Sequence, residues 1–428
     1  MSATANFAEE EISQPLTHST LAFLVGFFAS SRISIVLFTT RILGTEPSTG
    51  AAISIVLNVL LLTFVWFDVF GSSRRTFRTI LRLPSVRWVL AFILFSGCSL
   101  IWSETVSLQN SLAYWGDLVA DVAIVFLLLR TREITVVSHS LMKGFITSTC
   151  CLAVVAWLMP TQADLRLGDE DFFNTNQIGN LCALSIFLAQ YLMRRKEGRW
   201  GLATFFLIIT LLRSLSKTTL VAFFVSEIYL VLRDRSMSRR TKVLLMIAAV
   251  LLILVFWGLF ESYYDIYTVD SNQAETLTGR TAIWLFVLNS MVDHPWNLWI
   301  GHGFDSMWKV IPPFGPDRFE PRHAENELLQ QFYAYGAVGI ILFIGLYGSL
   351  YRQIRKMVRS PTKMLFLSLM LFIVVRGLAE AESFDLLLPL WFIVLMGTLA
   401  DHENIAVQEM AILSPVAPHY PYNSPQRI

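Results

Sequence analysis

The stretch HAENELLQQFYAYGAVG, residues 323–339, stands where a long polar segment gives way to an apolar run at 337–350. The segment before it is punctuated by prolines between residues 312 and 321. Ionisable side chains therefore lie at the entrance to a predicted membrane helix. Polar groups at that depth are costly, and they usually mark a functional site.

Composition places the chain among membrane proteins. Its 428 residues are 54% hydrophobic and 15% charged, and their mean hydropathy is +0.56. Repeated apolar runs near the length of a bilayer span predict an all-α polytopic protein with about twelve transmembrane helices. The net charge of +1 argues against a nucleic-acid partner. The cysteines fall inside apolar runs without metal-ligand spacing, so we expect small core residues rather than disulfides or zinc ligands. We predict no metal site and no cofactor.

The distribution of basic residues predicts the orientation in the membrane. They gather after alternate predicted spans, around residues 74–87, 130–132, 194–199, 233–242 and 352–363. Basic loops stay in the cytoplasm, which places both termini there. We therefore predict a disordered cytoplasmic N-terminus at 1–18, a membrane domain at 19–400 and a cytoplasmic tail at 401–428. The large loop at about 261–329, between the ninth and tenth helices, then faces outward.

Arg280 lies within this loop, just before the apolar run TAIWLFVLNSM at 281–291. That run is too short to span a bilayer and predicts a helix at the outer interface. A cation in the first turn of a helix is unfavourable by itself, because the helix dipole is positive there. An anion docked between them would make the arrangement favourable. The alternative is an arginine that reaches a lipid headgroup.

A second basic group stands in RSLSK, residues 213–217, between two short predicted spans at 200–212 and 218–232. Two tilted helices joined by a tight turn fit this pattern. Lys217 and Arg213 would then face outward with Arg280, and such a pair of basic sites suits a pyrophosphate. An ordinary interfacial lysine is the alternative.

His323, Glu325 and Glu327 are candidate acid–base groups. A lone loop histidine is more often inert than catalytic, but this one is two residues from a carboxylate and next to a membrane helix. Asn326 either caps that helix or binds a sugar hydroxyl.

Other residue types near the outer boundary have a structural and a functional interpretation. Trp284 belongs to a group of tryptophans that either form an interfacial belt or stack on sugar rings. Gly336 and Gly339 predict close helix packing.

Several short motifs occur in a characteristic order. They are SLIWSE near 100–103, Asn176, Ser216-Lys217, Gly279-Arg280 with Trp284, Gly301-His302-Gly303-Phe304, and Glu325-Asn326 with Gly336 and Gly339. In this order, over about residues 90–400, the chain resembles the O-antigen ligase / polysaccharide polymerase family of bacterial envelopes. Among its members the chain is most similar to the exopolysaccharide polymerases.

The resemblance implies a membrane glycosyltransferase. Such enzymes move a glycan from undecaprenyl diphosphate to an acceptor sugar hydroxyl at the periplasmic face of the bacterial inner membrane. The acceptor is another lipid-linked repeat unit in a polymerase and lipid A–core in a ligase. A chain-length regulator is a further implied partner, and membrane lipid surrounds the protein.

The resemblance also implies roles for individual residues. Arg280 and Lys217, with Arg213 beside them, would neutralise the leaving diphosphate without a metal. Asn176 would contact the sugar or the acceptor, together with Asn326 and Trp284.

One departure from the family pattern concerns the base. The family has a histidine where this chain has Glu325, and the nearest histidine is His323. A base works best with a pKa near the working pH, and an ordinary histidine is closer to it than an ordinary glutamate. We therefore favour His323 as the base, with Glu325 orienting it or the acceptor. Glu325 as the base is the alternative.

Two other classes of protein compete with the enzyme. A polytopic transporter predicts two similar halves, whereas this sequence has no obvious half-repeat and an asymmetrically placed loop. A non-catalytic envelope protein gains support from the missing signature histidine.

The orientation can be tested with reporter fusions. Fusions at Asp270 and at Arg239 should report opposite sides of the membrane, because basic loops are retained inside. A phosphatase and a fluorescent-protein reporter at each position would measure this. Both positions on the same side would refute the predicted topology.

Overall fold

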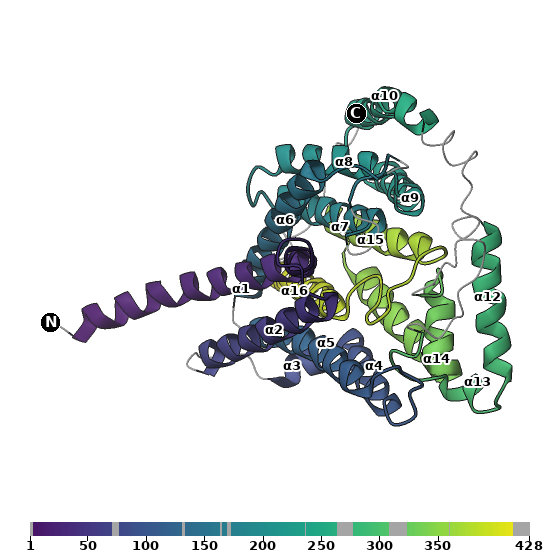
Figure 1. The fold of residues 1–428 in the computed structure, drawn as a ribbon. Coiled ribbons are helices and arrows are strands. Elements are labelled where there is room, and N and C mark those ends of the chain that lie inside the picture. The colour runs from purple at the N-terminus through teal and green to yellow at the C-terminus, as the bar shows by residue number, and fades with distance from the viewer. Residues whose placement is uncertain are drawn as a thin grey trace, which may run out of the picture.

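The computed structural model describes residues 3–70, 77–130, 133–162, 165–168, 173–235, 237–262, 277–307, 323–358 and 360–413. Every labelled element within these ranges is a helix (Figure 1). They are α1 (Ala3–Arg41), α2 (Pro47–Phe70), α3 (Phe77–Leu81), α4 (Pro84–Ser99), α5 (Leu108–Leu128), α6 (Ile134–Leu158), α7 (Thr175–Arg194), α8 (Gly201–Ser214), α9 (Lys217–Arg233), α10 (Arg239–Val255), α12 (Leu277–Val292), α13 (Asn297–Ile300), α14 (Glu327–Lys356), α15 (Pro361–Arg376) and α16 (Leu390–Leu413).

Five of the described helices have the length and apolar composition to cross a membrane. They are His18–Arg41, Pro47–Val69, Leu108–Leu128, Ile134–Leu158 and Glu327–Lys356. Shorter apolar helices occupy Pro84–Ser99, Gly201–Ser214 and Arg280–Val292. The chain is therefore an all-helical, multi-pass membrane protein, as predicted. The count of about twelve helices and the outward orientation of the large loop remain predictions.

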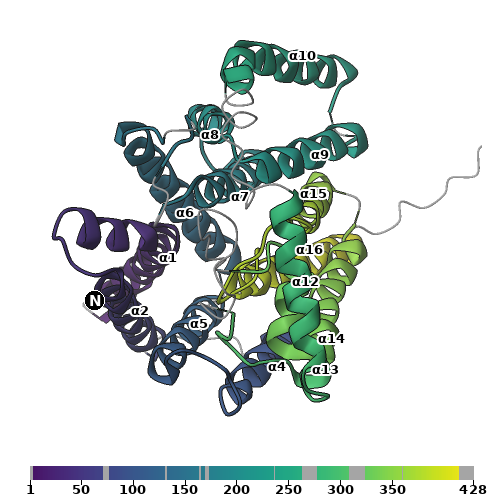
Figure 2. The ribbon, with the colours of Figure 1, turned by 45° about the vertical axis from the view of Figure 1, so that its right-hand side comes forward.

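Helix α16 forms the centre of the bundle. It packs against α4, α5, α6 and α14, and almost every side chain from Leu390 to Ala400 is buried. Helix α10 differs, since none of its residues is buried, and it lies at the edge of the molecule in Figure 1 and Figure 2. A helix that is apolar on all sides and contacts few neighbours is suited to lipid.

The bounds of α1 and α16 differ from the predicted domain limits. Helix α1 begins at Ala3, within the segment 1–18 for which the polar composition predicts disorder. Helix α16 continues past residue 400 to Leu413.

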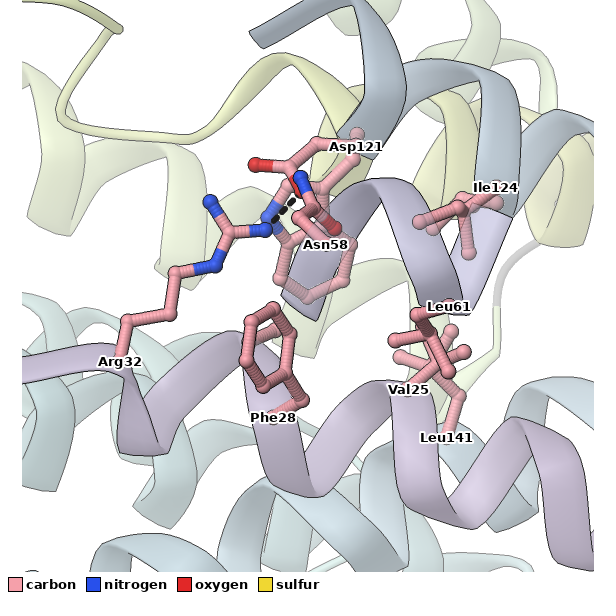
Figure 3. A pocket seen from close by; sticks show the side chains of 11 residues that line it. Val25, Phe28, Arg32, Asn58, Leu61, Asp121, Ile124 and Leu141 are labelled. Atoms are coloured by element: carbon pink, nitrogen blue, oxygen red, sulfur yellow. Dashed lines mark hydrogen bonds and ion pairs between the residues drawn. The ribbon is translucent and has the colours of Figure 1, made fainter. Parts of the chain in front are cut away.

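A charged cluster ties α1, α2 and α5 together (Figure 3). Arg32 pairs with Asp117 at 2.8 Å and also with Asp121. The amide of Asn58 donates to Asp117 Oδ1 at 2.6 Å and to Asp121 Oδ1 at 2.9 Å. All four side chains lie on membrane-spanning helices, where an unpaired charge is costly. Mutual pairing therefore fixes how these three helices pack.

Helix α14 is broken at Gly336, whose φ of 60° and ψ of −151° are accessible essentially to glycine alone. The break frees carbonyls that the helix would otherwise use. Tyr333 O accepts from His302 N at 3.0 Å, and Ala334 O accepts from Gly303 N at 2.8 Å. The predicted turn at 301–303 thus becomes the docking point of α13 on α14.

Among the glycines of α14, Gly336 packs closely against another helix, as predicted for the pair Gly336 and Gly339, whereas Gly339 faces its own helix. A Cβ on Gly336 would lie 2.4 Å from the carbonyl carbon of Trp299, so this glycine admits the backbone of α13. A Cβ on Gly339 would lie 2.4 Å from Tyr335 Cβ, on its own helix. The break in α14 explains the difference, because it folds the chain back on itself there.

The short helices around RSLSK match the prediction. Helix α8 ends at Ser214, Leu215 turns the chain with a φ of 58°, and α9 begins at Lys217. The short helix after Arg280 is also present as α12.

Gly336→Ala should lower the free energy of unfolding by about 1–3 kcal/mol or more, because alanine is strained at this φ and meets the backbone of α13. The matched control is Gly348→Ala on the same helix, where a Cβ would meet nothing within 4 Å. Unfolding of purified protein in detergent measures both changes. Equal stability of the two variants would contradict the proposed role of the break.

Candidate functional site

The site is built at the start of α14. Asn326 caps this helix, since its Oδ1 accepts from Leu329 N at 3.1 Å. Its Nδ2 donates to Leu378 O at 3.0 Å, and Glu327 N donates to Gly377 O at 2.9 Å. Both polar groups of the Asn326 side chain are thus engaged in holding α14 against the end of α15. Of its two predicted roles, the structure describes the capping role.

Glu325 stands just before this cap in an unusual backbone conformation. Its φ of 50° lies in the left-handed region that few non-glycine residues adopt. Such strained positions cluster at functional sites, where the surrounding structure holds them in place. The two hydrogen bonds from Asn326 and Glu327 to the end of α15 supply that restraint.

Three predicted residues meet at this point. Arg280 Nη2 lies 3.5 Å from Glu325 Oε2, and His323 Nδ1 lies 3.6 Å from Glu325 Oε1. Their side chains are 22%, 19% and 24% exposed for Arg280, Glu325 and His323. The three groups are therefore close together and partly open. The structure thus brings a predicted cation and two candidate acid–base residues into one cluster.

Trp284 helps to place this cluster. Its indole N–H donates to Ala324 O at 3.0 Å, so one turn of α12 beyond Arg280 is attached to the segment that carries His323 and Glu325. The side chain is committed to a backbone carbonyl, which gives it a positioning role between α12 and α14.

A second group of polar residues lies at the starts of α7 and α9. Ser216, the residue before α9, donates to Asn176 Oδ1 at 2.7 Å, and its oxygen lies 2.8 Å from Thr219 Oγ1. Because its oxygen is engaged in this way, the Asn176 amide presents its N–H₂ to Glu380, and it donates to Glu380 Oε1. Lys217 follows directly as the first residue of α9.

Glu380 and Arg376 were not among the predicted site residues. Glu380 is 3% exposed and Arg376 is 1% exposed. Their charged groups are 3.9 Å apart. Among the described residues, Nε and Nη1 of Arg376 have no hydrogen-bond partner. The available signal was an arginine at the end of an apolar run followed by the acidic segment AEAESFD at 379–385.

Arg213 is directed differently from the other predicted cations. Its guanidinium donates to the carbonyl of Leu165. The described contacts therefore join the end of α8 to the segment after α6, rather than joining Arg213 to Arg280 or Glu325. Its predicted share in a diphosphate site stays untested.

Two of the motifs turn out to bind each other. Ser99 Oγ accepts from Phe304 N at 3.0 Å, and Ser103 donates to Phe304 O. Glu104 accepts from His302 Nδ1 at 2.9 Å, and its backbone N–H donates to His302 O at 2.9 Å. The segment SLIWSE is thus hydrogen-bonded to the turn at 301–304. These bonds position α13, and through α13 they position α12.

No group of three or more His, Cys, Asp or Glu side chains within the described ranges is arranged to hold a metal ion. Glu325 is paired with Arg280 instead, and Glu380 accepts from the Asn176 amide.

Comparison with known proteins relates part of this chain to one family. A family model described as O-Antigen ligase matches residues 202–344. The O-antigen ligase of Pseudomonas aeruginosa is 28% identical over 105 residues, which are 24% of this chain and 25% of that relative. The resemblance to the O-antigen ligase family is confirmed. The matched region spans a quarter of the length of the Pseudomonas aeruginosa relative.

The O-antigen ligase match covers only part of the site. It includes α8, α9, α12 and the start of α14, and so contains Arg280, His323 and Glu325. Asn176 and Glu380 lie outside it, on α7 and in the loop between α15 and α16. The site thus combines residues inside the matched region with residues on either side of it.

The identity of the base can be tested by substitution. If His323 takes the acceptor proton, His323→Ala should lower turnover by about 10²–10⁴-fold, the range expected of a general base. Glu325→Gln should then lose less, since glutamine keeps the shape and one acceptor oxygen. Turnover in a glycan-transfer assay, recorded against pH, measures both.

The reverse ranking would identify Glu325 as the base, because glutamine cannot accept a proton. Loss of both activities to background would indicate that the two residues titrate as a pair. An active His323→Ala enzyme with the wild-type pH profile would refute our assignment.

Proposed function

We propose that this protein is a glycosyltransferase that moves a glycan from undecaprenyl diphosphate to an acceptor sugar hydroxyl. It works at the periplasmic face of the bacterial inner membrane and polymerises exopolysaccharide or O-antigen repeat units. The observation that supports this most is the cluster around Glu325, whose carboxylate oxygens lie 3.5 Å from Arg280 and 3.6 Å from His323.

The diphosphate would bind where positive charge converges. Arg280 has five N–H donors, so a single contact with Glu325 leaves capacity for phosphate oxygens. Lys217 opens α9 beside Ser216, and Asn176 lies in the first turn of α7. Helix N-termini add partial positive charge and backbone N–H groups, which favour an anion. Together these groups would stabilise the charge that develops on the leaving diphosphate.

The transfer itself needs one proton movement. The acceptor hydroxyl would lose its proton to His323, or to Glu325, as its oxygen attacks the anomeric carbon. The bond between that carbon and the diphosphate would break, with its electron pair remaining on the phosphate oxygen. Arg280 would then face the extra negative charge, which is the role that a metal ion fills in other enzymes.

A ligase that transfers glycan to lipid A–core is the second candidate. The matching family and the Pseudomonas aeruginosa relative are both described as O-antigen ligases. The two reactions share donor chemistry and differ in the acceptor. Supplying a lipid-linked repeat unit in one assay and lipid A–core in another separates them.

Arg280→Ala should abolish glycan transfer while the protein is still produced at the normal level. Arg280→Lys should rescue poorly, because lysine lacks the planar fork that binds phosphate in a bidentate manner. Arg240→Ala, at an exposed position near the start of α10, is the matched control and should keep full activity. Transfer from a purified lipid-linked donor measures all three.

Full activity in Arg280→Ala would remove this residue from the mechanism. Inactivity of the wild-type protein with each donor and acceptor tried would instead favour a transporter or a non-catalytic envelope protein.

A further inference from the structure

Glu380 is a buried carboxylate that the steps above do not use. It lies in the loop between α15 and α16, outside the membrane-spanning helices, and is 3% exposed. Asn176 donates to one of its oxygens, and Arg376 lies 3.9 Å from the other. Because Ser216 fixes the Asn176 amide, groups on α7, α9 and α15 together hold this carboxylate in one orientation.

The charges around Glu380 include both candidate acid–base groups. Glu325 and His323 act on it from the segment before α14, Arg376 from the end of α15, and Glu382 from its own loop. Burial has the largest effect on the pKa of Glu380, and the Glu325 carboxylate has the next largest. Both raise this pKa, which reaches about 7 although Arg376 and His323 lower it. The two segments that carry Glu325 and Glu380 also lie against each other, because Glu327 N donates to Gly377 O at 2.9 Å and Asn326 Nδ2 donates to Leu378 O at 3.0 Å.

Resting on the proposed glycan transfer, we infer that Glu380 takes over the proton that His323 or Glu325 removes from the acceptor hydroxyl. The acceptor O–H bond breaks and a bond from that oxygen to the anomeric carbon forms. The bond from the anomeric carbon to the diphosphate breaks, leaving the electron pair on phosphate. The proton ends on Glu380, so total charge is conserved. Glu380 acts through another group, and it is a positioning residue rather than a catalytic one.

The arrangement of ion pairs explains why the proton would be transferred from His323 or Glu325 to Glu380. Glu325 lies 3.5 Å from Arg280 and 3.6 Å from His323, and a proton that stayed on Glu325 would weaken its ion pair with Arg280. Protonation of His323 would leave a second cation beside Arg280. Glu380 has its single ion pair among the described residues at 3.9 Å, and burial already opposes its charge. Glu380 therefore loses a longer ion pair than Glu325 would lose when it takes the proton.

Glu380→Gln tests this directly, since glutamine still accepts a hydrogen bond from Asn176 but cannot take a proton. We expect turnover to fall by about 10²-fold or more, with the KM for the donor unchanged. The wild type should lose activity as the pH falls through about 7, where Glu380 becomes protonated, and the variant should lack this limb. The full chain in lipid nanodiscs, with a purified lipid-linked donor and acceptor, is the system to use.

Glu382→Gln is the matched control on the same loop. It should turn over near the wild-type rate, and its acidic limb should move slightly to lower pH, because one negative charge that raises the pKa of Glu380 is gone. Glu380→Asp should recover part of the activity and keep a pH limb, because it retains a carboxylate.

An unchanged rate and pH profile in Glu380→Gln, with an active wild type, would overturn this inference and leave the proposed function standing. Lack of transfer by the wild type would count against the proposed function itself. If Glu380→Gln fails to fold, Asn176→Ala provides the second measurement. Loss of a hydrogen bond to the ionised carboxylate should move the acidic limb to higher pH, and an unmoved limb would overturn the inference.

Discussion

The site depends on the contact between the start of α14 and the end of α15. The Asn326 side chain donates to Leu378 O, and Glu327 N donates to Gly377 O. These two hydrogen bonds hold the two helix ends against each other. A helix N-terminus must find partners for its N–H groups, and here a neighbouring helix end supplies one of them. This contact between the helix ends brings Glu325, just before α14, near Glu380, just after α15.

A second constraint brings α12 to the same place. The break at Gly336 exposes carbonyls of α14, and backbone N–H groups of the turn at 301–303 donate to them. The segment SLIWSE forms hydrogen bonds with the same turn. Helix α12 leads into this turn, so Arg280 approaches Glu325. Two local backbone requirements, a glycine-only conformation and unsatisfied carbonyls, therefore place a cation beside a carboxylate.

Buried charge is treated in two ways in this protein. In the cluster on the membrane helices, Arg32 forms ion pairs with Asp117 and Asp121, and the Asn58 amide donates hydrogen bonds to both carboxylates. Near Glu380, by contrast, Arg376 is held at 3.9 Å and keeps buried N–H groups that find no partner in the described part of the chain. The first arrangement serves packing. The second retains the capacity to respond to a proton or an anion, which is what a reaction site requires.

The sequence by itself determined the membrane class, the short helices around RSLSK, the helix after Arg280 and the turn at 301–303, since hydropathy, length and glycine position are local properties. It also indicated the Arg280 and His323–Glu325 groups, through helix-terminus reasoning and family resemblance. Only the tertiary structure decided that Asn176 binds Glu380, because that contact joins residues 204 positions apart. It likewise turned Arg213 toward Leu165 and Gly336 toward α13. Periodicity shows which face of a helix is apolar, but it does not show which distant helix end will lie against it.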